Sequence, residues 1–259
     1  MMGINLDSTA IVSNKAKIGN NVTIGPFTII HDDVEIGDNT QISSSVVLAN
    51  GSRIGNDCRI YSGVVVGTEP QDLKFGGETS LAIVGDRTVL REYATVNRAT
   101  KATGKTVVGS DCFIMAYCHV AHDCHLGNNI IIANATQLAG HVTIDDWATI
   151  GGVVKIHQFC RVGKHVMIGA DVKLAKDVAP YILMGSIPAK VDGVNKIGLK
   201  RKGFSYEKIY EIETFYKYTL FSSYNISDGI AKYKDDFEIS TEIQECIDFI
   251  QKSERGIYT

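Results

Sequence analysis

The chain has 259 residues, of which 44% are hydrophobic and 21% charged, the balance of an ordinary globular protein. Its net charge of −3 excludes a general attraction to nucleic acid or an anionic membrane, so an anionic ligand needs a local basic patch. No apolar run in the sequence reaches the roughly 18–20 residues that span a bilayer. Residues 1–7 lack the basic and apolar regions of a signal peptide. We therefore expect a cytoplasmic protein without a membrane span.

A six-residue aliphatic repeat keeps one phase from about residue 12 to about residue 180. Of the 28 positions divisible by six between 12 and 174, 25 are Ile, Leu or Val, and the exceptions are Asp72, Glu78 and Ala102. Helices favour spacings of three and four, and single strands favour two. A period of six predicts short flat strands joined by tight corners, with three hexads in each coil. The predicted fold is a parallel β-helix in which residues 18 apart lie above one another.

Small residues occupy fixed places in this repeat. Glycine often follows the aliphatic position, and we expect glycine, Asn or Asp to provide the corner conformation. Five cysteines lie two residues before an aliphatic position, in a slot that Ala or Ser fills in other hexads: Cys58, Cys112, Cys118, Cys124 and Cys160. Because free cysteine behaves as a small apolar residue, this slot predicts buried thiols and not disulfides.

The repeat is interrupted by two excursions, near residues 67–82 and 98–106. Each leaves and re-enters the repeat in phase, which predicts loops that project from an intact prism. Both are long enough to be functional. The stretch Gln71-Asp72-Leu73-Lys74 in the first is the most suggestive.

Five of the seven histidines fall between residues 119 and 157, on successive predicted coils. Adding 18 to His122 gives Gly140, and adding 18 again gives Gln158. Histidine is the natural general base near neutral pH. A glycine above it offers an unobstructed N–H, the type of donor that stabilises an oxyanion. This combination predicts acyl transfer.

A metal site is the alternative interpretation of these histidines, since His119, His122 and His125 lie beside Cys118 and Cys124. Their spacing of three turns the histidines to different sides of a flat wall, and the cysteines occupy the inward slot. A single wall histidine is more often a hydrogen-bonding residue than a catalyst. The cluster around a glycine favours catalysis.

After Pro180 the pattern becomes helical. Ser205 begins one amphipathic stretch, and Ser240 or Thr241 begins another. We expect a β-helix over residues 1–188 and a C-terminal helical domain over 189–259, with the helices covering the open edge of the last coil. Basic residues follow and flank that coil, a pattern suited to an acidic protein or a pyrophosphate: Lys155, Arg161, Lys164, Lys173, Lys196, Lys200, Arg201 and Lys202.

Five segments together resemble the UDP-N-acetylglucosamine O-acyltransferase family, which catalyses the first step of lipid A synthesis. They are residues 71–74, 113–124, 138–142, 156–159 and 193–201, and the similarity covers essentially the whole chain. The resemblance implies a left-handed β-helix, an exception to the usual right-handed crossover rule. It also implies a homotrimer with active sites between subunits, and neither a cofactor nor a metal.

The resemblance also implies a role for each catalytic residue. His122 would remove the proton from the sugar 3-hydroxyl, and Asp123 would orient the imidazole. The alkoxide would attack the thioester of an (R)-3-hydroxyacyl acyl carrier protein while the Gly140 N–H holds the oxyanion. The implied substrate-binding residues are Gln71, Asp72, Lys74, His119, His141, His157, Gln158, Asn195 and Arg201.

Several positions depart from the family pattern. Asn97 replaces the commoner His, Ile197 replaces Glu, and Lys202 replaces Arg. These changes leave open a second acceptor, the 3-amino analogue of the sugar nucleotide, which would form an amide. Ala170 occupies a position where glycine permits long acyl chains, and Lys173 is large, so both predict an acyl chain of medium length.

Other classes fit less well. The N-acyltransferase that acts later in the same pathway carries a sizeable N-terminal domain, whereas the hexads here begin near residue 12. An acetyl-CoA-dependent hexapeptide transferase would lack the five segments. A β-helix carbonic anhydrase needs zinc-binding histidines about five apart, a spacing absent among these histidines. A non-catalytic scaffold leaves the histidine–glycine column unexplained.

Overall fold

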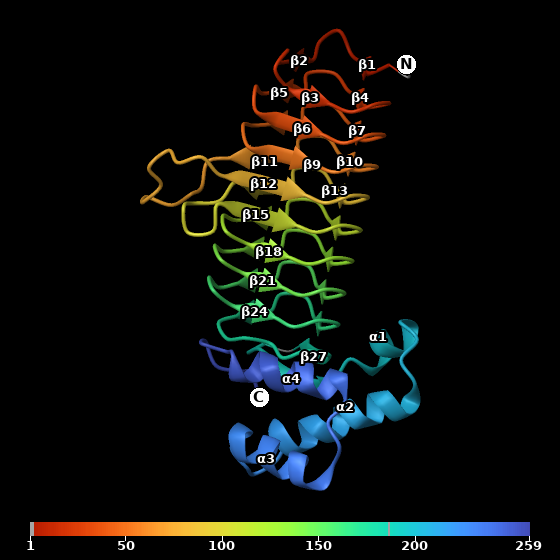
Figure 1. Cartoon of the computed structure of the whole chain (residues 1–259), viewed down its shortest axis with the longest axis vertical. Coiled ribbons are helices and arrows are strands. Elements are labelled where there is room, and N and C mark those ends of the chain that lie inside the picture. The colour runs from red at the N-terminus through yellow and green to blue at the C-terminus, as the bar shows by residue number, and fades with distance from the viewer. Residues whose placement is uncertain (1–2, 186) are drawn as a thin grey trace.

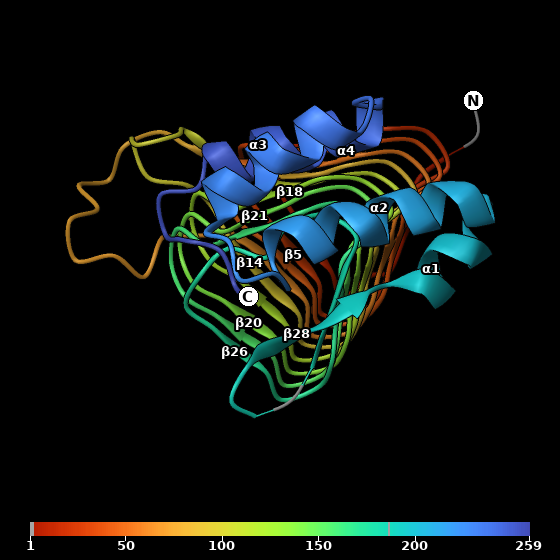
Figure 2. The same ribbon diagram turned by 90° about the horizontal axis from the view of Figure 1, so that it is seen from below.

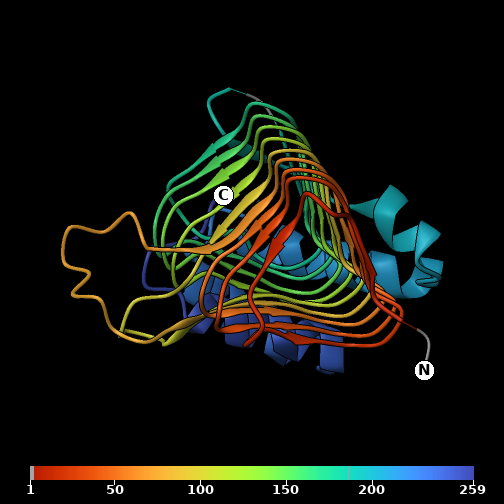
Figure 3. The ribbon, with the colours of Figure 1, turned by 90° about the horizontal axis from the view of Figure 1, so that it is seen from above.

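The computed structural model describes residues 3–185 and 187–259. Three sheets form the faces of a triangular prism, which is seen from the side in Figure 1 and from the N-terminal end in Figure 3. Successive short strands visit sheets A, B and C in turn, so each coil contributes one strand to each face.

Most strands in these sheets are two residues long, as the hexad repeat predicts. Sheet A contains β1 (Asn5–Leu6), β4 (Thr23–Ile24), β7 (Gln41–Ile42), β10 (Arg59–Ile60), β13 (Val89–Leu90), β16 (Phe113–Ile114), β19 (Ile131–Ile132), β22 (Thr149–Ile150), β25 (Met167–Ile168), β27 (Ile182–Gly185) and β28 (Lys190–Val194). Sheet B contains β2 (Ile11–Val12), β5 (Ile29–Ile30), β8 (Val47–Leu48), β11 (Val65–Thr68), β14 (Thr95–Asn97), β17 (His119–Val120), β20 (Gln137–Leu138), β23 (Lys155–Ile156) and β26 (Lys173–Leu174). Sheet C contains β3 (Lys17–Ile18), β6 (Val34–Ile36), β9 (Ser52–Ile54), β12 (Leu81–Val84), β15 (Lys105–Val108), β18 (His125–Leu126), β21 (Thr143–Ile144) and β24 (Arg161–Val162).

The strands pair in parallel with the predicted register. Partners are 18 residues apart in most coils, as for Phe113 and Ile131. Sheet C faces the viewer in Figure 1, and its strands run from left to right while the chain descends. This geometry makes the coil left-handed, as the family resemblance implied.

The aliphatic positions of the repeat point inward and form one continuous core from Ile24 to Leu174. The five repeat cysteines lie in the same core and are at most 1% exposed, which confirms their predicted slot. Burial raises the pKa of the Cys124 thiol to about 12, so this side chain is a packing group and not a thiolate ligand.

The corners differ from the sequence-based expectation. The residues with positive φ lie three after the aliphatic position and are mostly not glycine, as at Asp123 (φ 61°) and His141 (φ 62°). The glycines that directly follow the aliphatic residue serve close approach instead. A Cβ on Gly37 would lie 2.6 Å from the backbone carbon of Gly55 in the next coil. The expectation that these glycines provide the corner conformation was therefore wrong, whereas Asn or Asp does provide it at several corners, as at Asn21 (φ 56°) and Asp57 (φ 56°).

Both predicted loops project from the same edge of the prism, between sheets B and C (Figure 1). The first loop (residues 69–80) joins β11 to β12 and raises the partner spacing to 30, as between Arg59 and Val89. The second loop (residues 98–104) joins β14 to β15 and gives a spacing of 24, as between Thr95 and His119. The repeat resumes in phase after each loop.

The C-terminal segment continues sheet A before it becomes helical. β28 pairs antiparallel with β27, and the expected domain boundary at 188/189 falls between these two strands. The helices that follow lie beneath the last coil (Figure 2): α1 (Lys196–Arg201), α2 (Tyr206–Thr219), α3 (Ile226–Asp236) and α4 (Thr241–Gln251). Ser205 caps α2 by accepting from the Lys208 N–H, which confirms the predicted start. Neither α1 nor α3 was predicted. None of the helices in residues 3–185 and 187–259 is long and apolar enough to cross a membrane.

Candidate active site

His122 and Asp123 lie at the corner between β17 and β18, on the edge of the prism from which both loops project. The next coil brings Gly140 and His141 over them, because residues 18 apart share a position in the prism. Backbone pairing confirms this register, since the His141 N–H donates to the His122 carbonyl at 3.0 Å. The predicted stacking of Gly140 over His122 is therefore confirmed.

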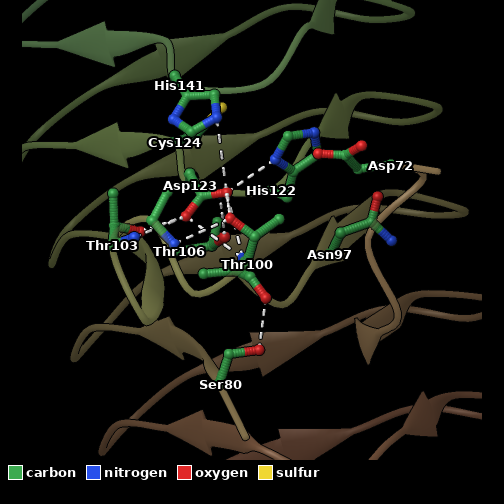
Figure 4. A network of polar contacts seen from close by, with 12 residues as sticks. Asp72, Ser80, Asn97, Thr100, Thr103, Thr106, His122, Asp123, Cys124 and His141 are labelled. Atoms are coloured by element: carbon green, nitrogen blue, oxygen red, sulfur yellow. Dashed lines mark hydrogen bonds and ion pairs between the residues drawn. The ribbon is translucent and has the colours of Figure 1, made fainter. Parts of the chain in front are cut away.

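The two side chains of the His122–Asp123 pair are in direct contact. His122 Nδ1 lies 2.8 Å from Asp123 Oδ2, and the Asp123 side chain is completely buried (Figure 4). Although burial by itself raises the pKa of this carboxyl, hydrogen bonds from Thr103, His122 and Thr100 outweigh it and hold the pKa below its usual value. The carboxylate therefore accepts from Nδ1–H, which leaves Nε2 of His122 free to take a proton.

Gly140 is the residue that makes room for the imidazole of His122. A Cβ at position 140 would lie 2.5 Å from His122 Cε1 and 2.7 Å from Nε2, closer than any real contact. Among the described residues, no group accepts a hydrogen bond from the Gly140 N–H. Along the edge between sheets C and A a side chain accepts from the corresponding N–H, as where Asp146 Oδ1 accepts from the Asn128 N–H at 2.6 Å. An available amide thus lies beside the free nitrogen of His122.

His141 lies on the other side of the same carboxylate. Its Nε2 is 3.8 Å from Asp123 Oδ2, and its ring stacks on Phe159 with centroids 4.5 Å apart. The possible ligand atoms of His122, Asp123 and His141 all lie within 4.8 Å of one another, so the group has the composition of a metal site. The carboxylate oxygens, however, are already engaged by His122 and the two threonines. This arrangement favours acid–base chemistry.

The remaining predicted histidines line the surface near this edge. His119 points outward from β17 and bonds the Thr95 hydroxyl through Nδ1 at 2.7 Å. Burial, with repulsion from His122, lowers the pKa of His119 and keeps it neutral. His157 and Gln158 are exposed two coils further along, and Arg255 from the C-terminal tail contacts His157 Nδ1 at 3.2 Å.

Gln71, Asp72 and Lys74 lie in the first loop. Gln71 and Lys74 are exposed. Figure 4 shows Asp72 on the side of His122 that faces away from Asp123. Asp72 Oδ1 accepts from the Lys74 N–H at 2.9 Å, so the carboxylate shapes the loop.

Four other predicted residues lie elsewhere on the prism. Asn195 caps α1 and donates to the His165 carbonyl at 3.0 Å, at the edge between sheets C and A. Arg201 is exposed at the end of that helix. Ala170 is at the edge between sheets A and B, and Lys173 points outward from sheet B. The structure therefore does not bring these four residues to His122 within one chain.

Sequence reasoning missed the residues that hold Asp123, namely Thr100, Thr103 and Thr106. The second loop was predicted as a projecting loop long enough to be functional, but no residue in it was assigned a role. Thr100, Thr103 and Thr106 recur at a spacing of three in and directly after this loop, and the loop projects from the edge that carries His122 and Asp123. Those two facts together were the available signal.

A left-handed β-helix with a histidine–carboxylate pair beside an open amide defines a hexapeptide-repeat transferase. A family model described as bacterial transferase hexapeptide (six repeats) matches residues 15–50 and 105–140. A second, described as UDP-N-acetylglucosamine O-acyltransferase, domain 2, matches residues 177–258.

The comparisons with whole proteins identify the family. An acyl-[acyl-carrier-protein]–UDP-N-acetylglucosamine O-acyltransferase of Chlorobium phaeobacteroides is 52% identical over 97% of this chain and 96% of its own length. The protein of that name from Thiobacillus denitrificans is 39% identical over 96% and 97%. A crystal structure of the UDP-N-acetylglucosamine acyltransferase from Bacteroides fragilis has 45% identity and a TM-score of 0.96, and covers 98% of this chain and 99% of that one. The chain belongs to the UDP-N-acetylglucosamine O-acyltransferase family and is an acyltransferase.

Proposed function

We propose that the chain transfers an (R)-3-hydroxyacyl group from acyl carrier protein to the 3-hydroxyl of UDP-GlcNAc, the first step of lipid A synthesis. The observation that carries this proposal is the contact of His122 with a buried carboxylate beside the open Gly140 amide. The names of the relatives specify the same donor and acceptor. We expect the reaction to take place in the cytoplasm.

The geometry supports a mechanism with His122 as general base. Asp123 accepts from Nδ1–H, so Nε2 takes the proton of the sugar hydroxyl. The oxygen then attacks the thioester carbonyl, and the Gly140 N–H stabilises the negative charge of the tetrahedral intermediate. When the intermediate collapses, the carrier thiolate leaves and receives the proton from the imidazolium. The C–O bond formed replaces the C–S bond broken.

A homotrimer with shared active sites is part of this proposal. The predicted nucleotide residues Asn195 and Arg201 lie near one edge of the prism, and His122 lies at another. A ligand that touches both sets therefore needs a second copy of the chain. Exposed apolar side chains also gather along the edge between sheets A and B, where Tyr93 and Tyr117 stack with centroids 5.2 Å apart while more than half exposed. Such a surface is typical of a subunit contact.

The hydroxyl acceptor is favoured over its 3-amino analogue. The relatives are named O-acyltransferases, and those names give no support to the amide alternative. Asn97, the departure that raised this alternative, donates to Thr68 Oγ1 at 2.9 Å and to the Glu69 carbonyl at 3.2 Å. Its amide group therefore braces the start of the first loop.

A competition assay tests the proposal. The purified protein would receive UDP-GlcNAc, its 3-amino analogue and 3-hydroxyacyl carriers of several lengths, with acetyl-CoA as a control donor. We expect an ester on UDP-GlcNAc and one free carrier thiol per product, measured by mass spectrometry and thiol titration. A predominant amide product, transfer from acetyl-CoA alone, or no transfer would contradict it.

A further inference from the structure

The second loop closes on Asp123 and saturates its carboxylate. The Thr100 hydroxyl donates to Oδ2 at 2.9 Å, and the Thr103 hydroxyl donates to Oδ1 (Figure 4). The backbone N–H groups of Thr100 and Thr103 also donate, at 3.2–3.3 Å. Thr106 holds the backbone of Asp123, because its hydroxyl accepts from the Asp123 N–H at 2.8 Å. A loop that interrupts the repeat thus supplies most of the hydrogen bonds to one side chain.

This arrangement determines which imidazole the carboxylate binds. Asp123 Oδ2 lies 2.8 Å from His122 Nδ1 and 3.8 Å from His141 Nε2, so two histidines compete for one oxygen. Thr103 occupies Oδ1 and so prevents the carboxylate from turning that oxygen toward either ring. With Oδ1 held, Oδ2 remains in place against His122.

The second loop is itself anchored, so its threonines are presented in a fixed position. Ser80 donates to the Ala99 carbonyl directly before Thr100. Glu78 in the first loop accepts from the Lys101 N–H at 2.9 Å. Arg98 lies over the ring of Phe75, 5.2 Å from its centroid. The two loops therefore brace one another, and the second loop is oriented by the first.

We propose that Thr103, assisted by Thr100, is a positioning residue that keeps Asp123 paired with His122 and so selects His122 as the base. The inference rests on the proposed function, since it concerns the base of that reaction. Thr103 does not touch substrate and acts only through Asp123. The second loop is then a support for the catalytic pair and not a substrate-binding element.

The consequence for pH dependence follows from the charge on the pair. The carboxylate of Asp123 stabilises the protonated form of the His122–Asp123 pair. When the Thr103 hydroxyl is removed and the carboxylate turns away from His122, this stabilisation weakens. The pair then loses its proton at a lower pH, so the acid limb of the rate profile moves to lower pH. A general loss of packing would lower activity at every pH without moving that limb.

The test compares Thr103→Val with Thr103→Ser in the transfer assay, as kcat and KM over pH. For T103V we expect kcat to fall about tenfold, both KM values to stay within about twofold, and the acid limb to move down by about one pH unit. T103S, which restores the hydroxyl, should recover both kcat and the limb. Thr136→Val is the control, because it removes a hydroxyl of the same kind that donates to the Gly151 carbonyl and not to Asp123.

An unmoved acid limb in T103V, or a T103S variant that folds but recovers neither quantity, would overturn the inference. So would a T136V variant that shifts the limb equally. The proposed function fails separately, if the wild-type protein makes no ester in the same assay. The two failures are therefore distinguishable.

Discussion

At the scale of single residues, the site depends on a glycine that leaves space and an aspartate that is fully occupied. The imidazole of His122 occupies the space that a side chain at position 140 would need, and Asp123 holds Nδ1 of that imidazole in place. The same glycine leaves its N–H open beside Nε2. Base and oxyanion donor are thereby placed together by one register relation between adjacent coils.

Gly140→Ala tests this relation. The new methyl would overlap the imidazole, so His122 must move away from both Asp123 and the reacting oxygen. We expect kcat to fall by at least about 100-fold, the effect of losing a general base, with an unchanged melting temperature of the prism. Gly152→Ala is the matched control, since a Cβ there meets only the Asn134 carbonyl at 3.3 Å. Near-normal activity in G140A would show that His122 does not depend on the space at position 140.

At the scale of elements, the hexad repeat explains what sequence alone predicted. A side-chain period of six is a local property, so the strands, their register and the inward cysteines follow directly from it. The stacking of Gly140 over His122 follows as well, because it needs only a constant coil length. The helices of the tail were predicted where a serine precedes an apolar period, as at Ser205.

What sequence did not predict depends on contacts between distant segments. The bonds from Thr100 and Thr103 to Asp123 form only because the second loop folds back on its own edge, and the six-residue repeat does not encode that path. The short helix α1 and the strand β28 are set by packing under the last coil. The role predicted for the glycines that follow the aliphatic positions was wrong for a related reason. These glycines are needed because the backbone of the next coil approaches closely, which is a tertiary constraint. In the sequence, a glycine required for this reason looks the same as a glycine required by a local turn.

Sheet B also carries the proposed determinant of acyl length. His119, Gln137, Lys155 and Lys173 form one outward column through successive paired strands. Three strand spacings of about 4.8 Å put Lys173 about 14 Å from His119.

Replacing Lys173 by Ala and Ala170 by Gly should shift the preferred donor to a longer acyl chain, with no change in the KM for the sugar nucleotide. Lys176→Ala, another exposed lysine of the last coil, is the control.

Donor competition among carriers of different length measures that shift. An unchanged preference in the double variant would remove Ala170 and Lys173 from the acyl groove. An equal shift in K176A would mean that surface charge, and not groove shape, governs donor choice.

At the scale of the whole molecule, the proposed site is incomplete in one chain. The catalytic pair and both loops lie on the edge between sheets B and C, while Asn195 lies at the edge between sheets C and A. The hydrogen-bonded sheets run continuously through the prism and keep these edges apart within one chain. In the proposed assembly a second copy would bring them together, and a closed trimer would repeat that contact three times.

A mixing experiment with two inactive variants tests the account most directly. His122→Ala alone should lose at least about 100-fold in kcat, and Arg201→Ala alone should lose nucleotide binding. His125→Ala, an exposed neighbour on sheet C, should stay active. When H122A and R201A are co-expressed and isolated as mixed oligomers, about a third of the shared sites in a cyclic trimer regain both residues. The account predicts that activity returns to about that fraction of wild type. Full activity in H122A, or mixed oligomers as inactive as their parents, would contradict it.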